Sequence, residues 1–368
     1  MKSKKLIVLA AILLLSLACS LLGPANTTDP SANLAATQNA LQLTQIAIES
    51  QQSGGNNEQP PSNNNSSDPP APTAQVVPQA PPAAVTRATG FGPAQPWGAG
   101  GGCHKACHFA DVNGDGFDDF IAEDNDGIYV LLSTGSGFAP YQKWSGGGCQ
   151  KACHFADVTG DGKADFIAED NNGIFVMPST GSGFAAHEPW GEGGGCNKAC
   201  HFADVTGDRK ADFIAEDNDG IYVLPSTGSG FGAAQPWGKG GGCQKACHFS
   251  DVTGDGIADF IAEDNNGIFV LRSNGSGFGP AEPWGEGGGC HRACHFADVT
   301  GDGKVDWIAE DNDGIYVLPS TGSGFPAYEP WGKGGGCQKA CHFADVTGDG
   351  IADFIAEDNN GIFVLVAQ

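Results

Sequence analysis

Six acidic loops contain the residues of this chain that are best suited to bind a ligand. The second loop reads DVTGDGKAD and places Asp157, Thr159, Asp161 and Asp165 at positions 1, 3, 5 and 9, with Lys163 at position 7. Alternate residues of a tight loop can point to one centre, so three carboxylates, a hydroxyl and one backbone carbonyl could surround a cation. Hard oxygen ligands and a flexible loop suit Ca²⁺ far better than Zn²⁺. The loops therefore predict up to six calcium sites.

Equivalent positions of all six loops are the predicted calcium ligands. They are Asp111, Asn113, Asp115, Phe117, Asp119, Asp157, Thr159, Asp161, Lys163, Asp165, Asp204, Thr206, Asp208, Lys210, Asp212, Asp251, Thr253, Asp255, Ile257, Asp259, Asp298, Thr300, Asp302, Lys304, Asp306, Asp345, Thr347, Asp349, Ile351 and Asp353. In the third loop Arg209 replaces the glycine of position 6, which places that site in doubt. An EF-hand would need a bidentate Glu at position 12 and helical flanks, whereas position 12 of the first loop is Ala122. An Asp- and Gly-rich turn without metal remains the alternative.

A pair of cysteines precedes each acidic loop. The segment WGEGGGCNKACHF (190 to 202) places Cys196 and Cys200 four residues apart, close enough for a local disulfide if the chain makes one turn. Zinc held by thiols and His201, or disulfides between repeats, are the alternatives. The predicted disulfide cysteines are Cys103, Cys107, Cys149, Cys153, Cys196, Cys200, Cys243, Cys247, Cys290, Cys294, Cys337 and Cys341. The histidines that follow are predicted to be hydrogen-bonded packing groups of an innermost strand; they are His108, His154, His201, His248, His295 and His342.

The net charge excludes two classes of partner. The chain has 43 acidic and 18 basic side chains, which gives a net charge of −25 at pH 7. Nucleic acid and anionic membrane surfaces repel such a protein, so neither is an expected partner. Hydrophobic residues make up 40% of the chain, and Phe and Trp recur at fixed intervals, which excludes disorder of the whole chain.

Residues 1–19 have the pattern of a secretory signal. Lys2, Lys4 and Lys5 precede a mostly apolar stretch that is shorter than a membrane span and ends before Cys19. The segment resembles a bacterial lipoprotein signal with Cys19 as the lipidation site; an uncleaved membrane anchor is the alternative. Twelve of the 13 cysteines then remain, an even set of the kind that forms disulfides in an oxidising compartment. We expect an extracytoplasmic, membrane-anchored protein at the cell surface or in the periplasm.

Two further regions follow the signal. Residues 20–89 are rich in Pro, Asn and Ser and predict a low-complexity, flexible tether. From residue 90 to 368 a Gly-Phe pair recurs every 46 or 47 residues, with Phe at positions 91, 138, 184, 231, 278 and 325. Four short strands at this period predict a blade of a β-propeller. In the second repeat the expected strands are 153–158, 165–170, 173–179 and 183–190.

The order of the strands predicts the number of blades and the way in which the ring closes. The repeats begin with a fourth-type strand at 90–97 and end after a third-type strand at 361–368. Pairing of these two strands would complete the last blade and remove an exposed edge. The fold class is therefore predicted to be all-β: a six-bladed β-propeller of four-stranded blades, expected to be monomeric.

The motif FADVTGDGKADFI (155–167) resembles FG-GAP, or VCBS, repeats such as those of the integrin α-chain propeller and some propeller lectins. The resemblance covers 90–368. It implies calcium binding and adhesion or ligand recognition, without identifying the ligand. Two features depart from the family: integrin propellers have seven blades, and the Cys-x-x-x-Cys element is not part of the general pattern.

The face opposite the acidic loops is the predicted ligand surface. Because strand directions alternate, the acidic loops and STGSG turns share one face, while the DNDG turns and cysteine connections share the other. Aromatic rings beside acidic groups could hold a sugar there, although packing between blades is the alternative for the tryptophans. The candidate ligand-binding residues are Trp97, Trp144, Trp190, Trp237, Trp284, Trp331, Asp126, Asp219 and Asp313.

These features predict a surface-anchored, calcium-binding recognition or adhesion module for a glycan or extracellular protein. Weak sites repeated around the ring would gain avidity on a multivalent surface. An enzyme should break the symmetry with one unique cluster, but departures such as Asp118, His187 and Trp307 are scattered over different strands. We therefore do not expect an enzyme; a structural spacer or surface scaffold is the alternative.

Overall fold

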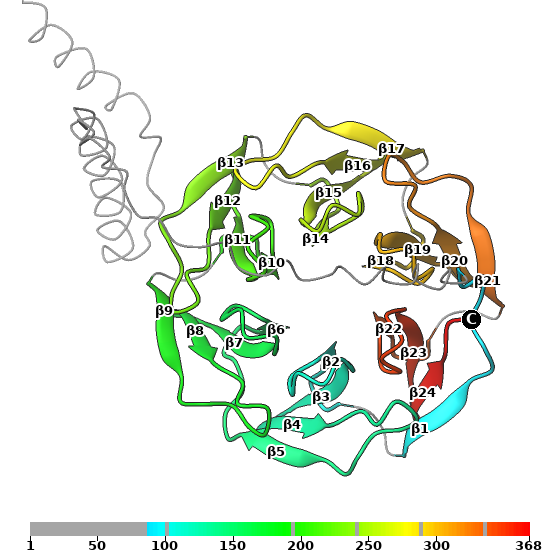
Figure 1. The fold of residues 1–368 in the computed structure, drawn as a ribbon, viewed down its shortest axis with the longest axis horizontal. Coiled ribbons are helices and arrows are strands. Elements are labelled where there is room, and N and C mark those ends of the chain that lie inside the picture. Colours follow the sequence, from blue (N-terminus) through cyan, green and yellow to red (C-terminus); the bar gives the residue numbers. More distant parts are fainter. Residues whose placement is uncertain (1–86, 100–102, 193–195, 240–242, 287–289, 334–336) are drawn as a thin grey trace, which may run out of the picture. The chain divides into compact units, whose positions relative to one another are not determined.

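The computed structural model describes residues 87–99, 103–192, 196–239, 243–286, 290–333 and 337–368. The predicted signal, Cys19 and nearly all of the predicted tether lie outside these ranges. The described residues form 24 strands in six four-stranded antiparallel sheets around a central axis (Figure 1). They include no helix that is long and apolar enough to span a bilayer. The six-bladed β-propeller predicted from the sequence is confirmed.

Each blade runs from an inner strand near the axis to an outer strand at the rim (Figure 1). Blade 1 comprises β2 (Ala106–Ala110), β3 (Asp119–Asp124), β4 (Gly127–Leu131) and β5 (Gln142–Ser145). Blades 2 and 3 comprise β6 (Ala152–Ala156), β7 (Asp165–Asp170), β8 (Gly173–Met177) and β9 (Glu188–Glu192), then β10 (Ala199–Ala203), β11 (Asp212–Glu216), β12 (Gly220–Leu224) and β13 (Gln235–Lys239). Blades 4 and 5 comprise β14 (Ala246–Ser250), β15 (Asp259–Asp264), β16 (Gly267–Leu271) and β17 (Glu282–Glu286), then β18 (Ala293–Ala297), β19 (Asp306–Glu310), β20 (Gly314–Leu318) and β21 (Glu329–Lys333). Blade 6 comprises β22 (Ala340–Ala344), β23 (Asp353–Asp358), β24 (Gly361–Leu365) and, as its outer strand, β1 (Gln95–Ala99).

The ring closes as predicted, by pairing of the first and last strands. β1 runs antiparallel to β24, with Gln95 opposite Val364. The contacts of this propeller begin slightly before the predicted boundary at residue 90. Ala88 is buried, and its amide donates to the carbonyl of Thr300 at 3.0 Å. The first described residues of the chain therefore already pack on the blades.

The fourth strand of each repeat is shorter than the sequence predicts. In blade 2 it begins at Glu188 and not at residue 183, because the Gly-Phe pair belongs to the preceding turn. Phe184 forms an isolated bridge with Ser179, and the amide of Thr180 donates to the carbonyl of Gly183 at 2.9 Å. The repeated Gly-Phe pair therefore closes a loop at the end of the third strand and does not start the outer strand.

The hydrophobic core is divided into clusters that lie between neighbouring blades. One cluster joins Ile167, Ile174 and Trp190 of blade 2 to Cys200 and Phe213 of blade 3. The alternating pattern of the two middle strands directs Ile and Val side chains into these layers, where most are fully buried. Since no blade has a core of its own, the ring depends on contacts between each blade and the next.

The hairpins between the second and third strands depend on glycine, as predicted from the DNDG and DNNG sequences. Gly127 has a φ of 152° and lies directly against the backbone carbonyl of Ser145 in the outer strand. A Cβ atom at this position would collide with that carbonyl oxygen. Glycine therefore permits both the backbone conformation and the close approach of β5.

Candidate functional site

The acidic loops do not form the predicted calcium sites. Among the residues that the structure describes, no group of three or more His, Cys, Asp or Glu side chains could hold a metal ion. The loop carboxylates bind the backbone of their own loop instead. Asp157 Oδ1 accepts the amide of Gly160 at 2.6 Å, and its Oδ2 accepts the amide of Gly162 at 2.8 Å. The prediction of calcium as a cofactor is therefore wrong for this structure.

The aspartates of position 5 also have partners within the protein. At position 5, Asp161 Oδ1 accepts the amide of Lys163 at 3.1 Å, while Oδ2 lies 2.7 Å from the Nζ atom of the same lysine. Lys210 and Lys304 form the same contact with Asp208 and Asp302, at 2.7 and 3.2 Å. In these three loops, a lysine ammonium supplies the positive charge that the sequence prediction assigned to a metal ion.

The aspartates of position 9 form what we call the Asp ring: Asp119, Asp165, Asp212, Asp259, Asp306 and Asp353, all fully buried. In blade 3, Asp212 Oδ2 accepts the amides of Val205 and Thr206 at 3.1 and 3.0 Å, and Oδ1 accepts that of Ser226 at 2.9 Å. The Ser226 hydroxyl then donates to the carbonyl of Val158 in blade 2 at 2.6 Å. In five blades the Asp ring therefore links the acidic loop to a turn whose serine binds the preceding blade, whereas in blade 6 Ala367 takes the place of that serine and has no hydroxyl.

Burial raises the pKa of the Asp ring carboxyls. The pKa is about 7 for Asp119 and Asp306 and about 6 for Asp259 and Asp353, although hydrogen bonds from backbone amides act in the opposite direction. Loop aspartates close to each of these four residues add to the increase. The Asp ring therefore has a structural role, because its carboxyls hold the acidic loops against the turns that contact neighbouring blades.

The tryptophans are not exposed plates for a sugar. All six predicted ligand tryptophans are between 5% and 9% exposed; they are Trp97, Trp144, Trp190, Trp237, Trp284 and Trp331. Each packs edge-to-face against the phenylalanine of a Gly-Phe pair, as Trp190 does against Phe231 at a ring-centroid distance of 5.3 Å. The alternative left open by the sequence, packing between blades, is therefore the observed role, and the prediction of ligand contact through these rings is wrong.

The cysteines form the six predicted local disulfides. The bonded pairs are Cys103–Cys107, Cys149–Cys153, Cys196–Cys200, Cys243–Cys247, Cys290–Cys294 and Cys337–Cys341. Each bond closes the turn that leads into an inner strand. Zinc binding by these thiols and disulfides between repeats are both excluded, because every described cysteine is used locally. Six disulfides indicate an extracytoplasmic environment.

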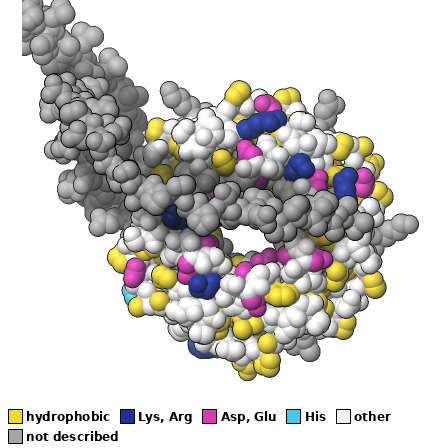
Figure 2. All heavy atoms as spheres, in the orientation of Figure 1, with side chains coloured by type: hydrophobic (Ala, Val, Ile, Leu, Met, Phe, Trp, Pro, Cys, Tyr) yellow, Lys and Arg dark blue, Asp and Glu magenta, His cyan; other side chains and the backbone are white. Residues whose placement is uncertain are grey.

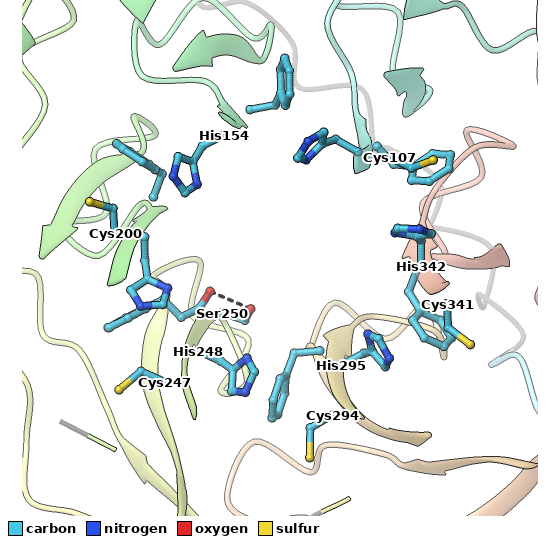
Figure 3. A pocket seen from close by; sticks show the side chains of 18 residues that line it. Cys107, His154, Cys200, Cys247, His248, Ser250, Cys294, His295, Cys341 and His342 are labelled. Carbon is cyan, nitrogen blue, oxygen red and sulfur yellow. Dashed lines mark hydrogen bonds between the residues drawn. The ribbon is translucent and has the colours of Figure 1, made fainter. Parts of the chain in front are cut away.

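A cavity of about 530 Å³ opens on the axis of the propeller (Figure 3). It is lined by the Cys-His-Phe residues of all six inner strands. The labelled histidines point toward the central space, whereas the labelled cysteine sulfurs point away from it. Figure 2 shows the central opening from outside, with acidic side chains at its margin. The cavity has the volume of a small-molecule site, for which about 300 to 1,000 Å³ is typical.

The six histidines, which we call the His ring, also connect neighbouring blades. His201 lies 5.0 Å from the ring centroid of Phe249 in the next blade. The series closes where His342 of blade 6 meets Phe109 of blade 1 at 5.1 Å. The predicted packing role of the histidines is therefore confirmed, and the interactions that line the cavity form an unbroken circle.

Behind the His ring lie six buried glutamates that the sequence analysis overlooked: Glu123, Glu169, Glu216, Glu263, Glu310 and Glu357. In blade 3, Glu216 Oε2 lies 3.8 Å from His201 Nε2, and Oε1 lies 3.5 Å from Lys198 Nζ. The available signal was the repeated Ala-Glu-Asp at the end of the second strand, opposite the repeated Lys and His of the first. The register of the two strands brings these three residue types together.

Hydrogen bonding of the histidines does not follow the prediction. The Nε2 atoms of His108, His154, His201, His248 and His342 are buried and have no hydrogen-bond partner within the described part of the chain. Burial, with a smaller contribution from neighbouring histidines, lowers the pKa of His154, His201 and His342 to about 4. These three imidazoles are therefore neutral at neutral pH.

The exposed ligand candidates are tyrosine–aspartate pairs at the rim of alternate blades. The Tyr129 hydroxyl donates to Asp126 at 2.9 Å in blade 1. The same bond occurs in blades 3 and 5, from Tyr222 to Asp219 at 2.9 Å and from Tyr316 to Asp313 at 3.1 Å. We call these three pairs the rim clusters. The predicted candidates Asp126, Asp219 and Asp313 are all exposed in the structure.

Two of the rim clusters carry a second tyrosine that the sequence analysis did not single out. Tyr141 and Tyr328 are 71% and 65% exposed. Their rings lie edge-on to Tyr129 and Tyr316, at centroid distances of 5.9 and 5.4 Å. Blade 3 has Ala234 at the corresponding place. The signal in the sequence was a tyrosine at the same position of two repeats where blade 3 has alanine.

Comparison with known families identifies the repeat type. Residues 111–168 and 251–309 match the model of an FG-GAP-like repeat, which confirms the resemblance of the loop motif. Each matched segment begins at an acidic loop and extends through the acidic loop of the next blade into the strand that follows it. No curated protein matches the sequence.

Two solved structures show a similar fold. A lectin of Agrocybe aegerita, described by its specific recognition of non-reducing terminal N-acetylglucosamine, is 25% identical with a TM-score of 0.54. The alignment covers 71% of this chain and 80% of the lectin. The Photorhabdus luminescens Tc holotoxin pore is 17% identical with a TM-score of 0.56, over 76% of this chain and only 15% of the toxin chain. The likeness to the toxin therefore concerns the fold alone.

Proposed function

Because this chain carries FG-GAP-like repeats in a six-bladed β-propeller, we propose that it is a non-catalytic recognition module that binds glycans at its rim. The similar fold of a glycan-recognising lectin supports this class of ligand. The uniform filling of the blade interiors also favours binding over catalysis, since the buried ionisable groups repeat around the ring and form no unique constellation.

The observation that carries the proposal is the threefold occurrence of the rim clusters. Each combines an aromatic face with a carboxylate held by a tyrosine hydroxyl. Sugar rings stack on aromatic faces through their C–H groups, while carboxylates accept hydrogen bonds from sugar hydroxyls. Both chemistries meet in one place on three blades. Several weak sites on one rigid ring would bind a multivalent surface with gained avidity.

The six disulfides support display of the propeller outside the cytoplasm, where such a surface would be met. In this proposal the lipid at Cys19 anchors the chain to the membrane, and residues 20–89 act as the tether between anchor and propeller. Adhesion or ligand capture at the cell surface is then the biological role.

A glycan array with matched variants tests the proposal. The full chain should bind a subset of glycans saturably, and the triple variant Asp126→Ala, Asp219→Ala, Asp313→Ala should lose that binding. The alternate blades offer a control, because Asn172, Asn266 and Asn360 occupy the equivalent turn positions; the corresponding triple Ala variant should bind like the wild type. A blank array would overturn the proposal and favour a structural spacer. Equal loss in both triple variants would also overturn it, because the rim clusters would then have no special role.

A further inference from the structure

The rim cluster of blade 5 differs from the others in a way that points to a specific ligand chemistry. We propose that Asp313, Tyr316 and Tyr328 bind a primary alkylammonium group, such as the amine of an amino sugar. This inference rests on the proposed function, which makes the rim a glycan-binding surface, and it names the ligand class of one site on that rim.

Blade 1 already contains an ammonium group in the equivalent cluster. Lys143 Nζ lies 2.9 Å from Asp126 Oδ2 and 5.3 Å from the ring centroid of Tyr129. The Tyr129 hydroxyl donates to the same Oδ2 atom. The hydrogen bond from Lys143 holds the pKa of Asp126 below its usual range, and the pKa of Lys143 is raised in return. This set of side chains therefore accepts an ammonium between a carboxylate and an aromatic face.

Blade 5 has the same set without the lysine. In the β4–β5 pair of blade 1, Lys143 lies opposite Tyr129, whereas in the β20–β21 pair of blade 5, Pro330 lies opposite Tyr316. The second tyrosine, Tyr328, is present and exposed. Blade 5 thus combines the carboxylate and both aromatic rings of blade 1 with an uncharged residue in place of the internal ammonium.

Blade 3 provides an internal comparison. It retains the Tyr222–Asp219 pair and has Pro236 opposite Tyr222, but Ala234 replaces the second tyrosine. One of the two aromatic walls is therefore missing. Blade 1 is occupied by its own lysine and blade 3 is incomplete, which leaves blade 5 as the one complete cluster of the three that has no ammonium group among the described side chains.

The expected affinity is weak at a single site. An ammonium over an exposed aromatic ring gains about two- to fivefold in affinity, and an exposed ion pair gains about one-and-a-half- to fivefold. The net charge of −25 adds a general attraction for cations that salt will screen. A dissociation constant on the order of tens to hundreds of millimolar follows, which a multivalent amino glycan would overcome through avidity.

The test is a titration of the full chain with small-molecule probes, in which the NMR chemical shifts of the tyrosine side chains report binding. The probes are glucosamine, Nα-acetyl-lysine methylamide and, as the uncharged match of the first, N-acetylglucosamine. Pro330→Lys copies the blade-1 lysine into blade 5 and should abolish ammonium binding. Lys143→Pro copies the blade-5 proline into blade 1 and should create a second site. Asp313→Asn should weaken binding about fivefold.

The outcomes separate this inference from the proposed function. Saturable shifts with either charged probe that disappear in Pro330→Lys support the inference. Binding of glucosamine but not of the lysine derivative identifies an amino glycan as the ligand. Binding of the lysine derivative but not of glucosamine identifies a lysine-bearing partner. Ammonium binding that persists in a folded Pro330→Lys protein overturns it, as does the absence of saturable binding to wild type. The glycan array with neutral sugars tests the proposed function independently, because neutral glycans do not need a cluster that can accept an ammonium group.

Discussion

The Asp ring is fully buried and the His ring is half-buried, and the two circles differ in how their polar atoms are satisfied. Asp212 receives three backbone amides, whereas His201 Nε2 in the same blade has no hydrogen-bond partner in the described chain. Buried polar atoms usually have partners, yet five of the six Nε2 atoms of the His ring lack one, compared with a single carboxylate oxygen of the Asp ring, Asp353 Oδ2. Equal repetition in the sequence therefore does not mean equal roles: one ring holds the loops together, and the other faces a cavity.

The two rings should also respond to pH in opposite directions. The pKa of His201 falls to about 4 from an ordinary value of 6.5, so its contribution to stability is complete above pH 6.5 and is lost as the pH falls toward 4. The pKa of Asp259 rises to about 6 from 3.8, so its contribution is complete below pH 3.8 and is lost as the pH rises through 6. Variants of both rings, and of the disulfides and loops next to them, test these differences.

The largest effect is expected from the Asp ring. Asp212→Ala removes the acceptor of two buried amides and one partly buried amide, each of which costs about 1–3 kcal/mol when left unpaired, so the free energy of unfolding should fall by at least about 3 kcal/mol. Asp208→Ala in the same loop is the control and should cost less than about 1 kcal/mol, because its ion pair with Lys210 is exposed. Guanidinium unfolding measures both. Similar losses in the two variants would show that the Asp ring has no special structural role.

The His ring should show a pH-dependent effect of similar size. His201→Gln removes one titrating group. As the pH falls from 7.5 to 4, the wild type should therefore lose about 3 kcal/mol more of its free energy of unfolding than the variant does. Trp237→Phe, a core change without an ionisable group, should give the same difference at both pH values. Urea unfolding at the two pH values measures the shift. A His201→Gln difference that does not vary with pH would refute the neutral state of the ring.

The disulfides stabilise the side of the blade that carries the His ring, because Cys200 immediately precedes His201. Removal of Cys196–Cys200 by a double Ala substitution should cost about 2 kcal/mol, the value expected for a closed loop of five residues. Thermal unfolding measures the loss. Reductant should lower the Tm of wild type further than that of the double variant, since five bonds remain to be broken in the variant and six in the wild type. An unchanged Tm in the double variant would contradict a stabilising role.

The smallest effect concerns the third acidic loop. Arg209 adopts a φ of 67°, a conformation that glycine adopts without strain and arginine only at an energetic cost, while its amide still donates to Asp204 at 2.6 Å. Arg209→Gly should therefore raise the free energy of unfolding by about 1 kcal/mol, and Arg209→Lys should not. Chemical unfolding distinguishes the two. No gain in the glycine variant would mean that the loop carries no backbone strain.

Much of the fold could be predicted because it follows from local periodicity. The recurring Phe positions and the order of strand types were sufficient for six blades and for the closure of β24 by β1. The site was harder to predict. Asp157 has the type and spacing of a cation ligand, but whether its oxygens meet a cation or the amides of Gly160 and Gly162 depends on how the loop backbone turns.

Packing decided two further features. The sequence left two roles open for Trp190, an exposed ligand-binding ring or packing between blades. Its contact with Phe231 of the next blade shows that it packs in the core. Glu216 was not singled out from the sequence, yet the pairing of β10 with β11 brings it beside His201 and Lys198. Neither outcome is encoded within a single repeat, because both depend on a neighbouring strand or blade.

The local disulfides, the glycine turns and the Asp residues of the DNDG turns could be predicted because each depends on residues only a few positions apart, and the sixfold repetition because these motifs recur at a fixed period. Which carboxylates accept backbone amides, which imidazoles lack a partner and which aromatic rings are exposed became clear only in the folded ring. It also placed Lys143 over Tyr129 and left Pro330 opposite Tyr316. The physical reason is that hydrogen-bond partners and burial come from other strands and other blades, whose register and contacts exist only in the closed ring.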